Sequence, residues 1–210
     1  MQKIVLQLVY CVAMRIVLRL FVGVRIKRAT FLLHEKQFII VANHNSHLDT
    51  MAIMASMPRQ LIANVKPVAA MDHFGKTPLK TRLSNFFVNT LLIQRKRDKE
   101  NPENDPIHSM IKALDQGYSL ILFPEGTRGE AEVEQPLKPG VGLVLSQRPL
   151  VKYVPVYMKG MGKAMPKNDN LIVPHNATVV YGNPTAIASL EVRDIVNQVE
   201  QSLHSLRDAL

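Results

Sequence analysis

Short apolar runs and segments of mixed polarity alternate along most of the chain. Apolar runs bounded by polar or turn-forming residues predict strands over 22–33, 37–42, 65–70, 90–93, 118–123, 151–157 and 177–181. Helix-start and helix-stop residues predict helices over 46–56, 78–88, 106–116, 139–147 and 190–206. The polar residues after Gly160 are expected to form a surface loop. Strands that alternate with helices predict an α/β fold with a mostly parallel central sheet flanked by helices.

The first 22 residues are strongly apolar, but only the stretch 4–14 is free of charge. A helix that spans a bilayer needs about 20 apolar residues, so this stretch is too short by that measure. Arg15 and Arg19 also stand where a signal peptide needs small residues, and the first serine is Ser46, whereas a transit peptide is Ser-rich. The sequence therefore favours none of these three segments.

Polar residues recur at every fourth position in the same segment. On a helix they form one stripe beside a broad apolar surface; they are Lys3, Gln7, Cys11, Arg15 and Arg19. A broad apolar face with a cationic edge is typical of a helix lying in a membrane interface, where arginines reach toward anionic headgroups. We therefore predict an N-terminal amphipathic membrane-interface helix over 1–21, followed by one domain over 22–210. An ordinary helix packed on the core is the alternative.

The charge balance supports an anionic partner. The chain has 26 Lys+Arg against 17 Asp+Glu, a net charge of +9. Nucleic acid is not expected, because no nucleic-acid-binding motif is present and the aromatic content is 6% with no Trp. The single cysteine, Cys11, excludes an internal disulfide and is typical of a reducing compartment. We expect a peripheral, monotopic protein on the cytoplasmic face of a membrane that contains anionic lipid.

Three polar clusters directly follow predicted strands. They occupy residues 43–49, 94–97 and 124–128. Ligand sites of α/β sheets lie at the carboxyl ends of the strands. We therefore expect the three clusters to converge on one site.

His44 and Asp49 form the pattern H-x-x-x-x-D at the first of these strand ends. Such a carboxylate can orient the imidazole and stabilise the imidazolium that forms when the ring accepts a proton, as a general base does. A purely structural His–Asp pair is one alternative, and a metal site that includes His47 is another, although no cysteine or further histidine cluster supports zinc. A serine hydrolase is disfavoured because the G-x-S-x-G pattern does not occur.

The run Phe-Pro-Glu-Gly-Thr-Arg at 123–128 is the second candidate for chemistry. Gly126 permits a tight turn close to a ligand, Thr127 offers hydrogen-bond donors, and Arg128 presents a planar fork suited to phosphate. Glu125 is expected to orient that arginine or to bind a substrate hydroxyl. A surface turn with a weak Glu–Arg pair is the alternative.

These residues resemble a known family. Asn-His-Asn-Ser-His-Leu-Asp at 43–49 and Phe-Pro-Glu-Gly-Thr-Arg at 123–128 are similar to the first and third motifs of the glycerolipid acyltransferases, above all the 1-acyl-sn-glycerol-3-phosphate acyltransferases. Ile93-Gln94-Arg95 resembles the second motif and Val154-Pro155-Val156-Tyr157 the fourth. Lys138-Pro139-Gly140 stands where the family often has Lys-x-Gly. The resemblance covers about residues 22–185 and identifies 22–210 as an acyltransferase domain.

The resemblance implies a direct acyl transfer. His44 would deprotonate the free hydroxyl of a lysophospholipid with help from Asp49, and the oxygen would attack an acyl thioester of coenzyme A or acyl carrier protein. No bound cofactor or metal is implied. Binding of the acceptor's phosphate and glycerol would fall to Arg95, Glu125, Gly126, Thr127 and Arg128, and handling of the acyl donor to the region of Pro155.

Two departures from the family pattern leave the acceptor open. Asn89 stands where the second motif usually starts with Gly, and Gln94 precedes its Arg in place of an apolar or acidic residue. Many relatives also have a Lys near the positions of Ala70 and Met71, whereas the nearest lysines here are Lys66 and Lys76. A different lysolipid acceptor is therefore an alternative. A non-catalytic protein that binds anionic lipid is another, disfavoured by the intact His44–Asp49 pair.

Overall fold

The computed structural model describes residues 1–71, 88–95, 101–131, 133–165 and 173–210. Within these ranges, seven strands form one sheet in the order β1-β7-β6-β2-β5-β3-β4. The strands are β1 Val24–Arg25, β2 Phe38–Ala42, β3 Val65–Ala70, β4 Leu91–Ile93, β5 Ser119–Leu122, β6 Lys152–Lys159 and β7 Ala177–Tyr181. All neighbours run parallel except β6 and β7, which are antiparallel. The predicted α/β fold with a mostly parallel sheet is confirmed.

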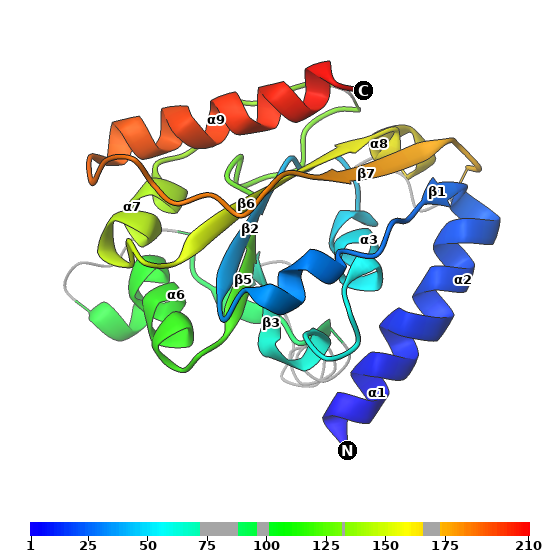
Figure 1. Ribbon diagram of the computed structural model, residues 1–210, viewed down its shortest axis with the longest axis horizontal. Coiled ribbons are helices and arrows are strands. Elements are labelled where there is room, and N and C mark those ends of the chain that lie inside the picture. Colours follow the sequence, from blue (N-terminus) through cyan, green and yellow to red (C-terminus); the bar gives the residue numbers. More distant parts are fainter. Residues whose placement is uncertain (72–87, 96–100, 132, 166–172) are drawn as a thin grey trace.

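Helices cover both faces of the sheet (Figure 1). They are α3 Asp49–Ser56, α6 Pro106–Asp115, α7 Gly140–Gln147, α8 Met161–Ala164 and α9 Val192–Asp208, with a helix at the N-terminus. Alternate residues of the buried central strand β2 enter two cores. Ile40 packs with α3 and the N-terminal helix, and Ile39 packs with α6, α7 and α9.

The start of α6 shows how local sequence sets an element. The carboxylate of Asp105 accepts hydrogen bonds from the backbone N–H groups of Ile107 at 2.7 Å and His108 at 3.4 Å, and Pro106 occupies the first turn. After the helix, Gly117 adopts φ +85°, a left-handed conformation that glycine enters without strain. Both predicted boundary signals are confirmed here.

Buried and exposed side chains recur at about every fourth position of the N-terminal helix. It runs from Gln2 to Val22 and alternates α turns, Gln2–Leu8 and Arg15–Val17, with wider π turns, Val9–Met14 and Leu18–Val22. Adding π turns to a 3.6-residue α period brings the average close to four residues per turn. One side is therefore buried at Leu6, Tyr10, Leu18 and Val22, and the opposite side is exposed at Ile4, Leu8, Val12, Ile16 and Leu20.

Arg15 binds the domain instead of reaching toward lipid. Its Nε and Nη2 atoms donate to the carbonyl oxygens of Ala55 at 2.7 Å and Met57 at 2.9 Å, at the C-terminal end of α3. Carbonyls at a helix end lack intrahelical partners and favour a cation. The prediction that Arg15 reaches toward headgroups is therefore wrong, whereas Lys3 and Arg19 are exposed.

The N-terminal helix is longer than the charge-free stretch 4–14, which by itself is too short to span a bilayer. Gln2–Val22 is 21 residues long with a mean hydropathy of 2.0 in its most apolar window, so among the described residues one helix is long and apolar enough to cross a membrane. Its buried side packs on the domain, as Figure 1 shows for the segment beside α3.

Three local predictions are wrong. The predicted strand over 22–33 is only Val24–Arg25 followed by a 3₁₀ helix, Thr30–His34, because the Ala29 N–H bonds to the Ser56 carbonyl and turns the chain. The helix predicted from Ser46 begins at Asp49, since residues 45–48 form a loop around that carboxylate. Residues after Gly160 first form α8, whose Met161 and Ala164 are buried. The helix predicted over 78–88 lies almost wholly outside the described residues.

Candidate active site

The carboxyl ends of β2, β5 and β6 lie side by side, because β2 pairs with β5 on one side and β6 on the other. The segment 43–49 follows β2, and the turn 124–128 follows β5. Arg95 follows β4 at the sheet edge, and its Nη1 lies 3.5 Å from the carbonyl oxygen of Gly126. The structure thus brings together the three predicted clusters, through those of their residues that it describes.

Hydrogen bonds join the first two clusters directly. The His44 N–H donates to Glu125 Oε1 at 3.1 Å, and the Gly129 N–H donates to the His44 carbonyl at 2.9 Å. A third hydrogen bond runs from the side-chain amide of Asn45 to the Glu130 carbonyl at 2.9 Å. The position of the turn 124–128 is therefore set by the same loop that presents His44.

Asp49 holds His44 in one orientation. Asp49 Oδ2 lies 2.9 Å from His44 Nδ1 and accepts the backbone N–H groups of Asn45 and Ser46, each at 2.8 Å. A carboxylate can only accept hydrogen bonds, so Nδ1 must carry the ring proton. Nε2 of the neutral ring is then the acceptor, as a general base requires.

The surroundings of His44 restrict the ring further. It stacks on Phe123, with ring centroids 4.1 Å apart and an interplanar angle of 20°. The side chain of Asp49 is only 1% exposed, but that of His44 is 19% exposed. The carboxylate is therefore shielded while the imidazole stays within reach of a ligand.

Asn43 is a positioning residue that the sequence did not single out. Its side-chain amide donates to the Met158 carbonyl at 2.9 Å, and its oxygen accepts the Met158 N–H at 2.8 Å. This pair fixes the loop after β2 to the end of β6. An Asn directly before the histidine is the signal that could have identified it, since an Asn side chain can pair with both the N–H and the C=O of one residue.

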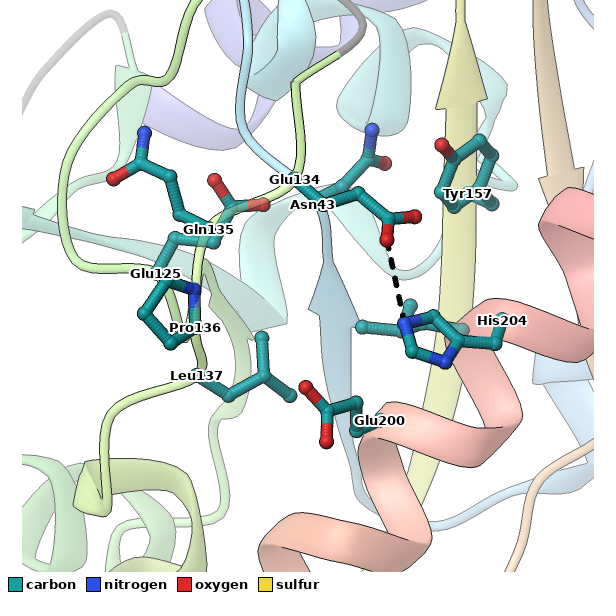
Figure 2. Close-up of a pocket in the computed structure, with 10 residues that line it drawn as sticks. Asn43, Glu125, Glu134, Gln135, Pro136, Leu137, Tyr157, Glu200 and His204 are labelled. Atoms are coloured by element: carbon teal, nitrogen blue, oxygen red, sulfur yellow. Dashed lines mark ion pairs between the residues drawn. The ribbon is translucent and has the colours of Figure 1, made fainter.

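Glu125 lies between His44 and a cavity of about 210 Å³. Figure 2 shows this cavity between the segment 134–137 and α9, lined also by Asn43, Tyr157, Glu200 and His204. Glu125 Oε2 is buried and has no hydrogen-bond partner among the described residues. Burial, with smaller contributions from the charges of Asp49 and Glu134, raises the pKa of Glu125 to about 7, although the His44 N–H opposes this.

Among the described residues, Glu125 does not pair with Arg128, which was one of the two roles expected for it. Arg128 contacts the ring of His47, whereas Glu125 bonds to the His44 backbone. His47 thus lies beside the phosphate-binding candidate, and among the described residues no group of three or more His, Cys, Asp or Glu gathers around a possible metal position. The Thr127 hydroxyl donates to Gln135 Oε1 at 3.3 Å, so Thr127 supports the turn from within.

The remaining candidates lie away from this cluster. Pro155 is buried within β6, in register with Val41 and before the strand end. Lys66 is at the opposite end of the sheet, next to the start of β5, with its Nζ 4.4 Å from the centre of the Tyr118 ring. Lys66 therefore does not supply the cation missing at Ala70, and Lys76 lies outside the described residues.

Asn89 has a structural reason to replace glycine. It adopts φ +59°, and its amide donates to the carbonyls of Ala63 at 3.0 Å and Val65 at 2.9 Å. Asparagine is one of the few residues other than glycine that enter this left-handed region readily. Asn89 thus adopts a backbone conformation that glycine also enters readily.

Comparison with known proteins identifies the family of this chain. A family model described as Acyltransferase matches residues 23–175, which is most of the chain. The chain belongs to this acyltransferase family. The similarity inferred from the motifs at 43–49 and 123–128 is therefore confirmed.

The individual relatives share less than a third of their aligned residues with this chain. The chain is 28% identical over 173 residues to a 1-acyl-sn-glycerol-3-phosphate acyltransferase of Cocos nucifera, covering 80% of this chain and 52% of that protein. It is 26% identical over 179 residues to a chloroplastic protein of the same name from Brassica napus, covering 79% and 46%. The chain thus spans about half the length of these curated relatives.

A solved structure shares the fold. The 1-acyl-sn-glycerophosphate (LPA) acyltransferase PlsC of Thermotoga maritima superposes with a TM-score of 0.74, covering 98% of this chain and 81% of that chain at 21% identity. The overall fold of this chain is therefore similar to that of a solved acyltransferase structure.

The raised pKa of Glu125 predicts a pH-dependent stability difference. The folded protein holds this proton up to about pH 7, whereas an unfolded Glu loses it near pH 4.5, so ionisation of the buried group destabilises the fold as pH rises. Glu125→Gln removes that cost. We expect its melting temperature to exceed that of the wild type by about 4 °C at pH 8, with most of the difference lost at pH 5.

Glu130→Gln is the matched control, because Glu130 is exposed in the same loop. Differential scanning calorimetry of both variants between pH 5 and 8 provides the measurement. A melting difference for Glu125→Gln that stays constant across this range would contradict the assignment.

Proposed function

We propose that the protein is a 1-acyl-sn-glycerol-3-phosphate acyltransferase, which converts lysophosphatidic acid to phosphatidic acid in phospholipid synthesis. The observation that carries the proposal is the His44–Asp49 pair, at 2.9 Å, placed beside the arginine-bearing turn 124–128. A base next to cations suits an acceptor that has both a hydroxyl and a phosphate. The names of the Cocos nucifera and Brassica napus relatives support the same acceptor.

The proposed reaction begins at Nε2 of His44. This nitrogen takes the proton of the acceptor hydroxyl, and Asp49 stabilises the resulting imidazolium through Nδ1. The acceptor oxygen then forms a bond to the thioester carbonyl carbon, and the carbon–sulfur bond breaks. The leaving thiolate receives the proton from His44, so the base is regenerated without an acyl-enzyme.

The other residues of the turn would bind the acceptor. Arg95 and Arg128 would hold the phosphate, and Glu125 would accept a hydrogen bond from the glycerol while it fixes the His44 backbone. Gly126 and Thr127 would shape the turn around the headgroup. The acyl group would come from acyl-CoA or acyl carrier protein, and its binding would involve the β6 region around Pro155.

We also propose that the N-terminal helix attaches the enzyme to a membrane surface that contains anionic lipid. Its exposed side is apolar at every fourth residue from Ile4 to Leu20, and its other side is bound to α3 through Arg15. A helix held along the domain in this way suits a position in the plane of the interface. Lys3 and Arg19 would then contact anionic headgroups.

Replacement of His44 tests the proposed reaction. We expect His44→Ala to lower the rate of acyl transfer from acyl-CoA to lysophosphatidate by about 10²–10⁴-fold, because general-base assistance is lost. The matched control is His108→Ala, an exposed histidine on α6. An unchanged rate of acyl transfer in His44→Ala would exclude the mechanism. The wild-type protein is also assayed with a panel of lysolipids. If it acylates other lysolipids but not lysophosphatidate, the proposed acceptor is excluded.

Polar substitutions on the exposed stripe test membrane attachment. We expect Leu8→Gln combined with Val12→Gln and Ile16→Gln to weaken sedimentation with anionic liposomes by at least about tenfold, since each removes apolar surface from contact with lipid. Deletion of the helix is a poorer test, because Tyr10 and Leu18 belong to the core.

The control for this variant is Leu150→Gln with Leu190→Gln, two exposed leucines elsewhere on the domain. Both variants should melt at the wild-type temperature. Full liposome binding by the stripe variant would place the attachment surface elsewhere.

A further inference from the structure

The side chain of Lys138 lies across the turn 124–128. A methyl group added to Gly126 would come within 2.8 Å of Lys138 Nζ and 3.0 Å of its Cδ. Gly126 adopts φ +72°, so a side chain is disfavoured there by conformation as well as by space. The glycine therefore leaves room that the lysine occupies.

The backbone holds Lys138 in this place. Its N–H donates to the Pro124 carbonyl at 2.8 Å, which ties residue 138 to the first residue of the turn. The preceding segment is also held: Glu134 Oε2 lies 2.8 Å from Arg207 Nη1 and 3.4 Å from His204 Nε2 on α9 (Figure 2 shows the His204 pair). The position of Lys138 thus follows from its own backbone hydrogen bond and from the anchored segment that precedes it.

Lys138 is a cation for which the described residues provide no neutralising partner. Its side chain is exposed, and among the described residues it makes no ion pair or side-chain hydrogen bond. Arg95 approaches the carbonyl of the same Gly126, and Arg128 is two residues further along the turn. Lys138 and Arg95 therefore approach Gly126 from two separate segments, and Arg128 of the same turn contacts His47.

We propose that Lys138 is a phosphate-binding residue that selects an acceptor with a phosphomonoester headgroup. This inference rests on the proposed function and adds a specificity-determining residue to it. A phosphomonoester carries a charge of about −1.5 to −2 at pH 7, which is more negative than that of a phosphodiester. The ammonium group of a lysine is a point charge and attracts the more negative headgroup more strongly. A third cation therefore favours lysophosphatidate over lysolipids whose phosphate is esterified a second time.

Kinetics of Lys138→Gln test this role. We expect KM for lysophosphatidate to rise about 10–100-fold, the size of effect typical for a lost charge-assisted hydrogen bond, with kcat within about threefold of wild type. Lys138→Arg should recover most of the loss. Lys112→Gln is the matched control, because Lys112 is an exposed lysine on α6 paired only with exposed Glu103.

Direct binding separates this inference from the proposed function. Titration calorimetry with sn-glycerol 3-phosphate, which has the headgroup but no acyl chain, should show affinity weakened by a similar factor in Lys138→Gln. An unchanged KM and unchanged affinity would overturn the phosphate role, as would a fall in kcat alone, which indicates a structural role in the turn. Wild-type protein that binds sn-glycerol 3-phosphate through Lys138 but does not acylate lysophosphatidate would overturn the proposed function and leave the binding role standing.

Discussion

One carboxylate oxygen organises the active-site loop. Asp49 Oδ2 accepts two backbone N–H groups and faces the His44 ring, and Asp49 is buried. These donors replace the water that Oδ2 loses, whereas Oδ1 is buried with no hydrogen-bond partner among the described residues, so loss of a donor from Oδ2 is costly. The loop therefore has one favourable conformation, with Nε2 of His44 as the acceptor. Because Glu125 and Gly129 bond to the His44 backbone, the turn 124–128 takes its position from the same oxygen.

Patterns of a few adjacent residues predicted the parts of this molecule that depend on local chemistry. The buried apolar run of β5 and the Asp105–Pro106 start of α6 were predicted because each signal lies within its own element. The strand-end rule placed His44 beside Glu125 because parallel strands share one edge. The family resemblance then supplied the chemistry, which spacing alone left open.

Features that depend on distant contacts were missed. The 3₁₀ helix at Thr30–His34 follows from an N–H bond to Ser56, and Arg15 is drawn to carbonyls at the end of α3, 40 residues away. The partners of Asn43 and Arg128 likewise come from other strands and loops. Sequence spacing shows which residues can share a face, but it does not show which carbonyl or ring a long side chain will reach.

In this structure Asp49 fixes the His44 tautomer so that Nε2 is the free base. Nitrogen-15 NMR of histidine-labelled protein, with His44→Ala used to assign the signal, tests it most directly. At a pH where the ring is neutral, we expect a protonated Nδ1 and an unprotonated Nε2 for His44, and a mixture of tautomers in Asp49→Ala. A wild-type His44 protonated at Nε2 would show that Asp49 does not set the tautomer.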